Sequence, residues 1–148
     1  MTRCDLRVGV IGLGALGLPI AANLRRADVA LRVHTRSRSP ERDPSLQGSI
    51  ACATPAEAAE GVNVLLVCVS DNAAVEAVLF GANGASSQLA AGSVVVDCST
   101  IAPATAIALA KRLARQGVDY VDAPVTGGTE GAKAGSLTVL VGGEAAAL

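Results

Sequence analysis

The sequence predicts a doubly wound α/β fold, in which a mostly parallel sheet carries helices on both faces. Short apolar runs alternate with segments of helical periodicity along the chain, and this alternation favours a parallel sheet. The apolar runs at 62–70 and 93–99 are continuous rather than alternating, as expected for strands that are buried on both faces. The length of 148 residues suits a single domain that spans 1–148.

The elements are expected in a regular order. Strands are predicted at 6–12, 30–36, 49–53, 62–70, 93–99, 118–124 and 137–143, and helices at 16–28, 54–61, 71–81 and 103–117. Pro19 falls in the first turn of the first helix, where its missing N–H does little harm. Thr54, Pro55 and Glu57 form a helix-start signal with a capping box. The segment 37–48 is a loop or a short helix, and the glycine-rich segment 125–136 joins the last two strands.

The composition excludes several classes of function. One Tyr, one Phe and no Trp leave no aromatic platform for stacking bases, and the net charge of −1 gives no field that would attract nucleic acid or anionic lipid. The longest apolar run is too short to span a bilayer, and no signal peptide is evident at the start of the sequence. The four cysteines, Cys4, Cys52, Cys68 and Cys98, form no C-x-x-C pair. We therefore expect reduced thiols, no metal and a cytoplasmic protein.

A glycine turn lies between the first strand and the first helix. Its sequence, Gly12-Leu13-Gly14-Ala15-Leu16-Gly17, fits the pattern G-x-G-x-x-G. In this position the first glycine allows a tight turn, the second lets the backbone approach a pyrophosphate, and the third lets helix and strand pack closely. The N–H groups and the dipole of the helix then favour an anion. The motif predicts a Rossmann-type dinucleotide site, and a purely structural turn is the alternative.

The end of the second strand indicates which dinucleotide is bound. NAD sites usually place Asp or Glu there to bind the ribose 2′-hydroxyl, but the sequence Thr35-Arg36-Ser37 has no acid. Arg36 suits a 2′-phosphate, because its paired N–H groups bind phosphate well. We therefore expect NADP rather than NAD, unless Arg36 is only a solvated loop charge.

Several segments in the same order resemble one known family. The segments 8–24, 33–37, 94–103 and 120–143 are similar to the signatures of the 3-hydroxyacid dehydrogenases, the superfamily of 3-hydroxyisobutyrate and 6-phosphogluconate dehydrogenases. The resemblance covers almost the whole chain. This sequence has Leu16 and Ile20 where the family often has Met, and Thr126 where the family usually has Ser. The methyl group of Thr126 narrows the substrate pocket that the resemblance implies.

The resemblance assigns roles to individual residues. It implies that the pyrophosphate is held by Leu13, Gly14, Ala15 and Leu16, the adenosine ribose and its phosphate by Thr35, Arg36 and Ser37, the ribose and adenine side by Val69, Ser70 and Asp71 with Val75 behind, the nicotinamide region by Thr100, and the substrate carboxylate by Ser99, Thr126, Gly127 and Gly128. Consecutive glycines after a strand can also turn their N–H groups toward an anion, although a structural turn is an alternative. We interpret Asp97 and Asp122 as structural hydrogen-bonding groups, and Lys111 and Lys133 as solvated charges.

The resemblance also implies an activity that this chain holds only in part. Such enzymes transfer a hydride between NADP(H) and a small hydroxy acid, semialdehyde or 2-oxo acid. In the family the general acid/base is a lysine of a second, all-helical domain, which also makes the dimer contact, and "GGEAAAL" looks like the opening of the helix that leads to it. We therefore expect no catalytic residue in this chain, which should bind cofactor and turn over poorly. The expected partner is a small carboxylate substrate, and full-length members are expected to be homo-oligomers.

Three other functions remain open from the sequence. An imine reductase shares the glycine turn and an arginine at the strand end, but the Gly127-Gly128 turn suits acid substrates better. A methyltransferase that uses S-adenosylmethionine would need an acid where Arg36 lies. A non-catalytic NADP-binding module is the third alternative.

Overall fold

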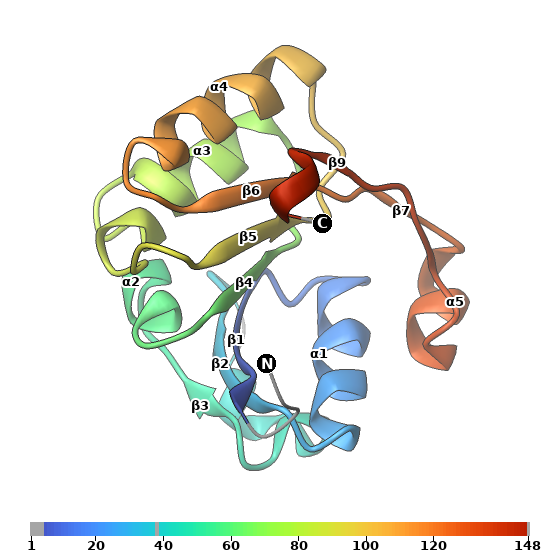
Figure 1. Ribbon diagram of the computed structural model, residues 1–148. Coiled ribbons are helices and arrows are strands. Elements are labelled where there is room, and N and C mark those ends of the chain that lie inside the picture. Colours follow the sequence, from blue (N-terminus) through green and yellow to red (C-terminus); the bar gives the residue numbers. More distant parts are fainter. Residues whose placement is uncertain (1–4, 38, 148) are drawn as a thin grey trace.

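The computed structural model describes residues 5–37 and 39–147 and forms a doubly wound sheet (Figure 1). The sheet order is β3-β2-β1-β4-β5-β6-β9, and all neighbours are parallel except the antiparallel pair β6 and β9. The strands are β1 (Arg7–Ile11), β2 (Ala30–His34), β3 (Ile50–Ala51), β4 (Val64–Val67), β5 (Val94–Asp97), β6 (Asp119–Asp122), β7 (Val125–Thr126), β8 (Thr138–Val139) and β9 (Gly142–Gly143), and the helices are α1 (Gly17–Arg26), α2 (Pro55–Ala59), α3 (Asn72–Phe80), α4 (Pro103–Ala114) and α5 (Gly128–Ala134).

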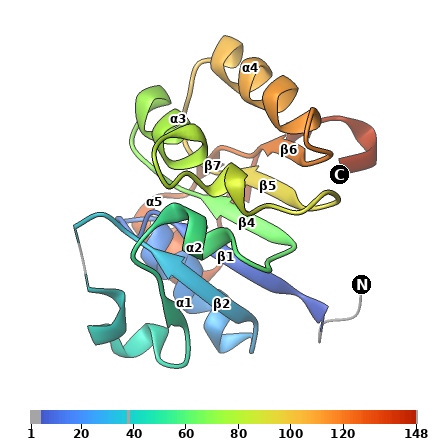
Figure 2. The same cartoon turned by 90° about the vertical axis from the view of Figure 1, so that its left-hand side faces the viewer.

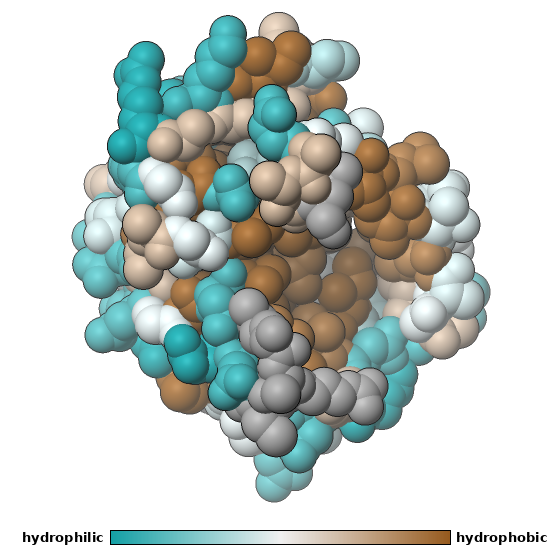
Figure 3. Space-filling model, viewed as in Figure 1, coloured by the Kyte–Doolittle hydropathy of each residue, from teal (hydrophilic) through white to brown (hydrophobic). Residues whose placement is uncertain are grey.

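Helices cover both faces of the sheet, as the sequence predicts (Figures 1 and 2). Helices α2, α3 and α4 enclose one hydrophobic core with the inner side chains of β4, β5 and β6, including Leu65 and Val95. Helix α1 encloses a second core with side chains of β1 and β2, including Val10 and Val33. On the α1 side the sheet is covered less completely, because Leu66 and Val96 stay half-buried. Figure 3 shows hydrophobic residues in the hollow beside α1.

The predicted start signal of α2 is present, and α3 begins with a cap that was not predicted from the sequence. The Thr54 hydroxyl accepts the Glu57 N–H at 3.1 Å and caps α2. The Glu57 carboxylate reaches back to the N–H of Ala53 at 2.9 Å, one residue before the cap itself. Asp71 caps α3 in the same way by accepting the Ala74 N–H at 2.8 Å. The segment 37–48 contains two 3₁₀ turns, Pro40–Arg42 and Pro44–Leu46.

The prediction for residues 125–143 is wrong in two respects. The glycine-rich segment 125–136 is not a plain connection, because it contains β7 and helix α5. The predicted strand 137–143 is divided into β8, which pairs antiparallel with β7 in a separate two-stranded sheet, and β9, which pairs antiparallel with β6. These pairings join segments distant in sequence, and the hydrophobic pattern of a single segment does not specify its partner strand.

Within the described residues, no helix is long and apolar enough to cross a membrane.

Candidate functional site

The carboxyl ends of β1, β4, β5 and β6 lie side by side at one edge of the sheet. Backbone hydrogen bonds continue the ladder just past these ends, from Cys68 to Ile11 at 2.9 Å and from Cys98 to Val67 at 2.8 Å. The chain leaves β1 through α1 toward β2 on one side, while β4 lies on the other side. This makes the gap between β1 and β4 the topological switch point, which is where open α/β sheets bind ligands.

The glycine turn between β1 and α1 shows which of its glycines the fold itself requires. A Cβ on Gly12, whose φ is +94°, would collide with the carbonyl oxygen of Cys68, and a Cβ on Gly17 would collide with the carbonyl oxygen of Gly12. A Cβ on Gly14 would meet no atom within 4 Å, and its φ is not positive. The fold therefore explains Gly12 and Gly17 but not Gly14. The open space beside Gly14 fits a group that approaches the backbone closely.

The same turn presents unpaired hydrogen-bond donors. In the described part of the chain, the N–H groups of Leu13, Gly14, Ala15 and Leu16 donate to no acceptor. Helix α1 has no side-chain cap and no acidic residue in its first turn, so its positive dipole end faces this space unneutralised. The Leu13 side chain is buried in the core, which leaves only its backbone for a ligand. The turn fits the phosphates of a dinucleotide.

The end of β2 lies beside this turn, since Gly12 donates its N–H to the His34 carbonyl at 2.9 Å. The His34 imidazole is paired with the Cys52 carbonyl through Nδ1 at 3.0 Å. Beyond it Thr35 is half-buried, and Arg36 and Ser37 are exposed. The predicted cofactor residues at this tip therefore include one exposed cation and no acid.

Asp71, in the loop after β4, interacts electrostatically with Arg36 at the end of β2. The hydrogen bond from the Ala74 N–H, then that from the Ser70 hydroxyl, hold the pKa of Asp71 below its usual range, and the charge of Arg36 adds a smaller lowering. Ser70 and Asp71 are exposed and Val69 is half-buried, so these three predicted residues can reach a ligand. Val75 is fully buried in the core behind them, and it supports the loop from below.

A buried network supports the loop after β5. Asp97 is fully buried and accepts the Tyr120 hydroxyl at 2.8 Å and the Ser99 N–H at 2.9 Å. The Ser99 hydroxyl in turn accepts the Val69 N–H at 3.0 Å, and Ser99 is 2 % exposed. Burial, together with the charge of Asp97, raises the pKa of Tyr120, so its phenol remains a donor.

This network confirms the structural reading of Asp97. Sequence reasoning missed Tyr120 as its partner, because the partner lies 23 residues away on another strand. The neighbouring Thr100 is exposed at the edge of the crevice. The Ser99 hydroxyl oxygen already accepts the Val69 N–H. A contact between Ser99 and substrate, as predicted, would therefore have to use the hydroxyl proton as donor. Asp122 lies near Asp97, and burial, followed by the Asp97 charge, raises the pKa of the Asp122 carboxyl.

Three of the four predicted carboxylate-binding residues lie at the start of α5, whereas Ser99 lies in the loop after β5. Thr126 ends β7, and Gly127 and Gly128 follow with φ values of +128° and +62°. All three are exposed, and a Cβ on Gly128 would meet no atom within 4 Å. They belong to the small β7-β8 unit rather than to the main sheet, but α5 packs against α1.

Two grooves adjoin the crevice at the strand ends. One, of about 390 Å³, runs between α1 and α5 and begins at Gly14 and Ala15. The other, of about 420 Å³, lies between α4, β6 and β9. No group of three or more His, Cys, Asp or Glu residues in the described ranges could hold a metal ion.

The comparison with protein families agrees with this geometry. Residues 7–148 match the family of the NAD binding domain of 6-phosphogluconate dehydrogenase. The chain belongs to this family. The resemblance inferred from the segments between 8 and 143 is thereby confirmed, and so is the Rossmann-like fold.

Curated relatives of this NAD-binding domain are oxidoreductases of hydroxy acids. The chain is 38% identical over 138 residues to 2-(hydroxymethyl)glutarate dehydrogenase of Eubacterium barkeri, covering 93% of the chain and 46% of the relative. It is 42% identical over 142 residues to L-threonate dehydrogenase of Cupriavidus necator, covering 95% and 47%. It is 36% identical over 142 residues to an NAD-dependent L-serine dehydrogenase of Pseudomonas aeruginosa, covering 96% and 48%. The chain thus spans about half the length of these relatives.

Solved structures show the same fold. A 3-hydroxyisobutyrate dehydrogenase from Salmonella typhimurium superposes with a TM-score of 0.87 at 32% identity, over 97% of this chain and 50% of that one. Psf3 in complex with NADP+ and 2-OPP gives 0.86 at 39% identity, over 95% and 50%. A reductive aminase from Aspergillus terreus in complex with NADPH4, cyclohexanone and allyl amine gives 0.79 at 26% identity, over 94% and 48%.

Proposed function

We propose that this NAD(P)-binding domain is the cofactor half of an NADP-dependent hydroxyacid dehydrogenase. The observation that carries the proposal is the acid-free end of β2, where the exposed Arg36 lies beside the phosphate-binding turn. A carboxylate at this position would repel a 2′-phosphate, whereas a guanidinium binds one through paired donors. A structural relative at 39% identity carries NADP+, which supports the same choice.

Different residues of the crevice bind different parts of the cofactor in this proposal. The N–H groups from Leu13 to Leu16 receive the pyrophosphate, and Thr35, Arg36 and Ser37 receive the phosphorylated ribose. Val69, Ser70 and Asp71 border the ribose and adenine, and Thr100 borders the nicotinamide. NADP supplies the hydride chemistry when it is bound.

The start of α5 receives the substrate in this proposal. Thr126 offers a hydroxyl, and the positive φ values of Gly127 and Gly128 allow their N–H groups to turn toward a carboxylate. The substrate is a small hydroxy acid or the corresponding semialdehyde or 2-oxo acid, in line with the hydroxy-acid names of the relatives.

We place the proton donor outside this chain. A positioned acid or base contributes about 10²–10⁴-fold to the rate, and the relatives are about twice as long as this chain. The isolated chain is therefore expected to bind cofactor and turn over poorly. We place the whole enzyme in the cytoplasm as a homo-oligomer, and the free thiols of Cys52, Cys68 and Cys98 suit a reducing compartment.

Calorimetric titration tests the cofactor assignment. We expect NADPH to bind more tightly than NADH, and Arg36→Ala to weaken NADPH by about ten- to a hundredfold, since hydrogen bonds to charged groups contribute about 1.5–3 kcal/mol. NADH affinity should change little. Arg115→Ala is the matched control, because Arg115 is exposed at the far end of α4. Equal affinities for the two nucleotides would remove the NADP preference, and no binding of either would remove the cofactor role.

Imine reduction is the second candidate, favoured by the superposition on the reductive aminase. The two candidates differ in what the turn at Gly127 and Gly128 binds. The NADP-saturated chain is titrated with 3-hydroxypropionate and, separately, with cyclohexanone, while the amide NMR signals of the two glycines are followed. A response to the acid supports the hydroxyacid dehydrogenase, and a response to the ketone alone supports the imine reductase.

A further inference from the structure

Helix α5 is short and buries little of its surface. It has seven residues, among them Gly128 and Gly131, and only Ala132 is buried. The interior Gly131 costs about 0.8–1 kcal/mol relative to Ala, and isolated helices of this length are marginal in water. Figure 1 shows that α5 stands beside α1, apart from the main sheet. Apart from β7, which leads into it, and Leu137, which lies against Gly127 and Gly131, α5 is placed by its contacts with the neighbouring helix.

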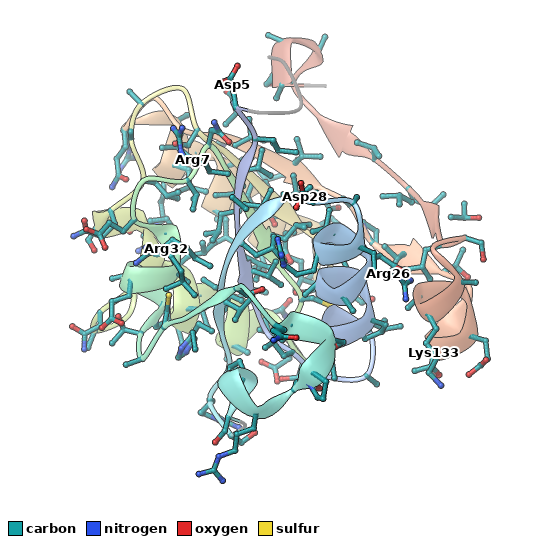
Figure 4. The ribbon with its side chains drawn as sticks, turned by 90° about the horizontal axis from the view of Figure 1, so that it is seen from below. Asp5, Arg7, Arg26, Asp28, Arg32 and Lys133 are labelled. Carbon is teal, nitrogen blue, oxygen red and sulfur yellow. The ribbon has the colours of Figure 1, made fainter. Side chains whose placement is uncertain are left out.

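Those contacts come from one polar site on α1. The side-chain amide of Asn23 donates through Nδ2 to the Ala132 carbonyl at 2.7 Å. Arg26 donates to the Lys133 carbonyl at 3.3 Å, and Figure 4 shows Arg26 of α1 on the side toward α5, which carries Lys133. The carbonyls at the end of a helix have no partner within the helix. The Ala132 carbonyl also accepts the Gly135 N–H at 3.3 Å, so Asn23 adds a second, shorter hydrogen bond there, and Arg26 supplies the bond to the Lys133 carbonyl. Both side chains join the end of α5 to α1.

The orientation of the Asn23 amide is fixed as well. Arg26 donates through Nη2 to the Asn23 Oδ1. Because the oxygen is thus occupied by a donor, the nitrogen of the amide is directed to Ala132. Elsewhere the two helices are separated by the groove lined by Leu18, Ala22 and Thr129, among others, so they are not held by close packing along their whole length.

The two ends of this arrangement lead to the two halves of the proposed site. Helix α1 begins at the phosphate-binding turn, and the opposite end of α5 begins at Gly127 and Gly128. A helix of seven residues is a rod of about 10 Å, so a displacement of its last carbonyls is transmitted to its first glycines. Asn23 therefore connects the carboxylate turn to the same helix that binds the phosphates.

We propose that Asn23 is a positioning residue, which holds the Gly127-Gly128 turn at the distance from the cofactor that carboxylate recognition requires. Asn23 touches neither ligand. The inference rests on the proposed function, because it assumes that this turn binds the substrate carboxylate. Arg26 assists by orienting the Asn23 amide.

The test uses the NADP-saturated 148-residue chain and 3-hydroxypropionate as the probe, followed through the NMR signals of Gly127 and Gly128. We expect Asn23→Ala to lower the affinity for 3-hydroxypropionate about tenfold, the factor that corresponds to the loss of one such hydrogen bond. The affinity for NADPH should stay within about twofold of the wild-type value. Arg26→Ala should have a smaller effect in the same direction. Asn23→Gln, which keeps the donor on a longer side chain, should recover part of the affinity.

Asn63→Ala is the matched control. Asn63 makes the same kind of bond, from its Nδ2 to the Asp5 carbonyl at 2.8 Å, and it also accepts the Arg7 N–H at 2.8 Å. It precedes β4 and so lies at the opposite edge of the sheet from the crevice. If Asn23→Ala and Asn63→Ala lower the affinity for 3-hydroxypropionate equally, the cause is a general loss of stability and the inference is overturned.

The outcomes separate the inference from the proposed function. If the wild-type chain responds to 3-hydroxypropionate and Asn23→Ala responds equally, only the positioning role is overturned. If the wild-type chain does not respond, the carboxylate site itself is wrong and the positioning role falls with it. A parallel loss of NADPH affinity in Asn23→Ala would show that Asn23 acts on the phosphate turn, which also overturns the inference.

Discussion

Substitution of Gly14 by alanine should change nucleotide affinity without lowering the stability of the fold. No atom lies within 4 Å of a Cβ at this position, and the backbone does not require a positive φ. Gly14→Ala should therefore fold normally. Replacing Gly by Ala at a compatible position raises stability by about 0.4–1 kcal/mol, because the unfolded chain loses conformational freedom.

The same methyl group would occupy the space where the pyrophosphate approaches the turn. Loss of even one hydrogen bond to the charged phosphates corresponds to about 1.5–3 kcal/mol, or about ten- to a hundredfold in affinity. We expect this loss for NADPH and for NADH alike, because both carry the pyrophosphate. Arg36→Ala, in contrast, should affect NADPH alone.

Gly17→Ala is the contrasting variant in the same turn. Its Cβ would lie well inside 3.0 Å of the Gly12 carbonyl oxygen, a backbone atom that can move only with the turn. Overpacking of this kind costs about 1–3 kcal/mol, and each kcal/mol lowers Tm by about 2–4 °C in a chain of this size. Thermal unfolding measures the stability of both variants, and calorimetry measures nucleotide affinity. A folded Gly14→Ala chain that binds NADPH like the wild type would refute the assignment of this turn to phosphate.

Two further predictions concern the buried groups behind the site. Tyr120→Phe removes one of the two hydrogen bonds described above to the buried Asp97 and should lower the free energy of unfolding by about 1.5–3 kcal/mol; an unchanged urea midpoint would contradict the network. Burial, with smaller contributions from Cys68 and Asp97, raises the pKa of Cys98 from 9.0 to about 12. The native state therefore keeps a proton that the unfolded state releases, so stability should fall as pH rises from about 9 toward 12. Urea titrations at several pH values should show a smaller slope for Cys98→Ala, whereas an identical slope would exclude this contribution. The raised pKa values of Cys68 and Tyr120 add to the same slope, so it should shrink rather than vanish.

The parts of the fold that depend on local signals were predictable from the sequence. The glycine turn, the cap at Thr54 and the buried strands β4 and β5 each depend on residues close together in the chain. Their physical causes, a tight turn, a side-chain cap and two-sided burial, leave a pattern in a short window.

The parts that depend on distant partners were not predictable in the same way. Helix α5 is rich in glycine, and its contacts with Asn23 span 109 residues. The Tyr120 hydroxyl meets Asp97 only because β5 and β6 are neighbours in register. The one available sequence signal for the contact between α1 and α5 was an asparagine in the interior of α1. Asparagine is not a favoured helix former, and its side chain there is expected to make a hydrogen bond.

Both edge strands of the main sheet are very short. β3 and β9 have two residues each, so neither border offers a long row of free N–H and C=O groups to an incoming chain. Sheets with long open borders invite edge-to-edge aggregation and fibril growth, and short border strands are one of the ways in which proteins suppress it. We expect the exposed Val139, Leu140 and Val141, rather than the sheet borders, to be the segment most exposed to self-association when the domain is concentrated alone.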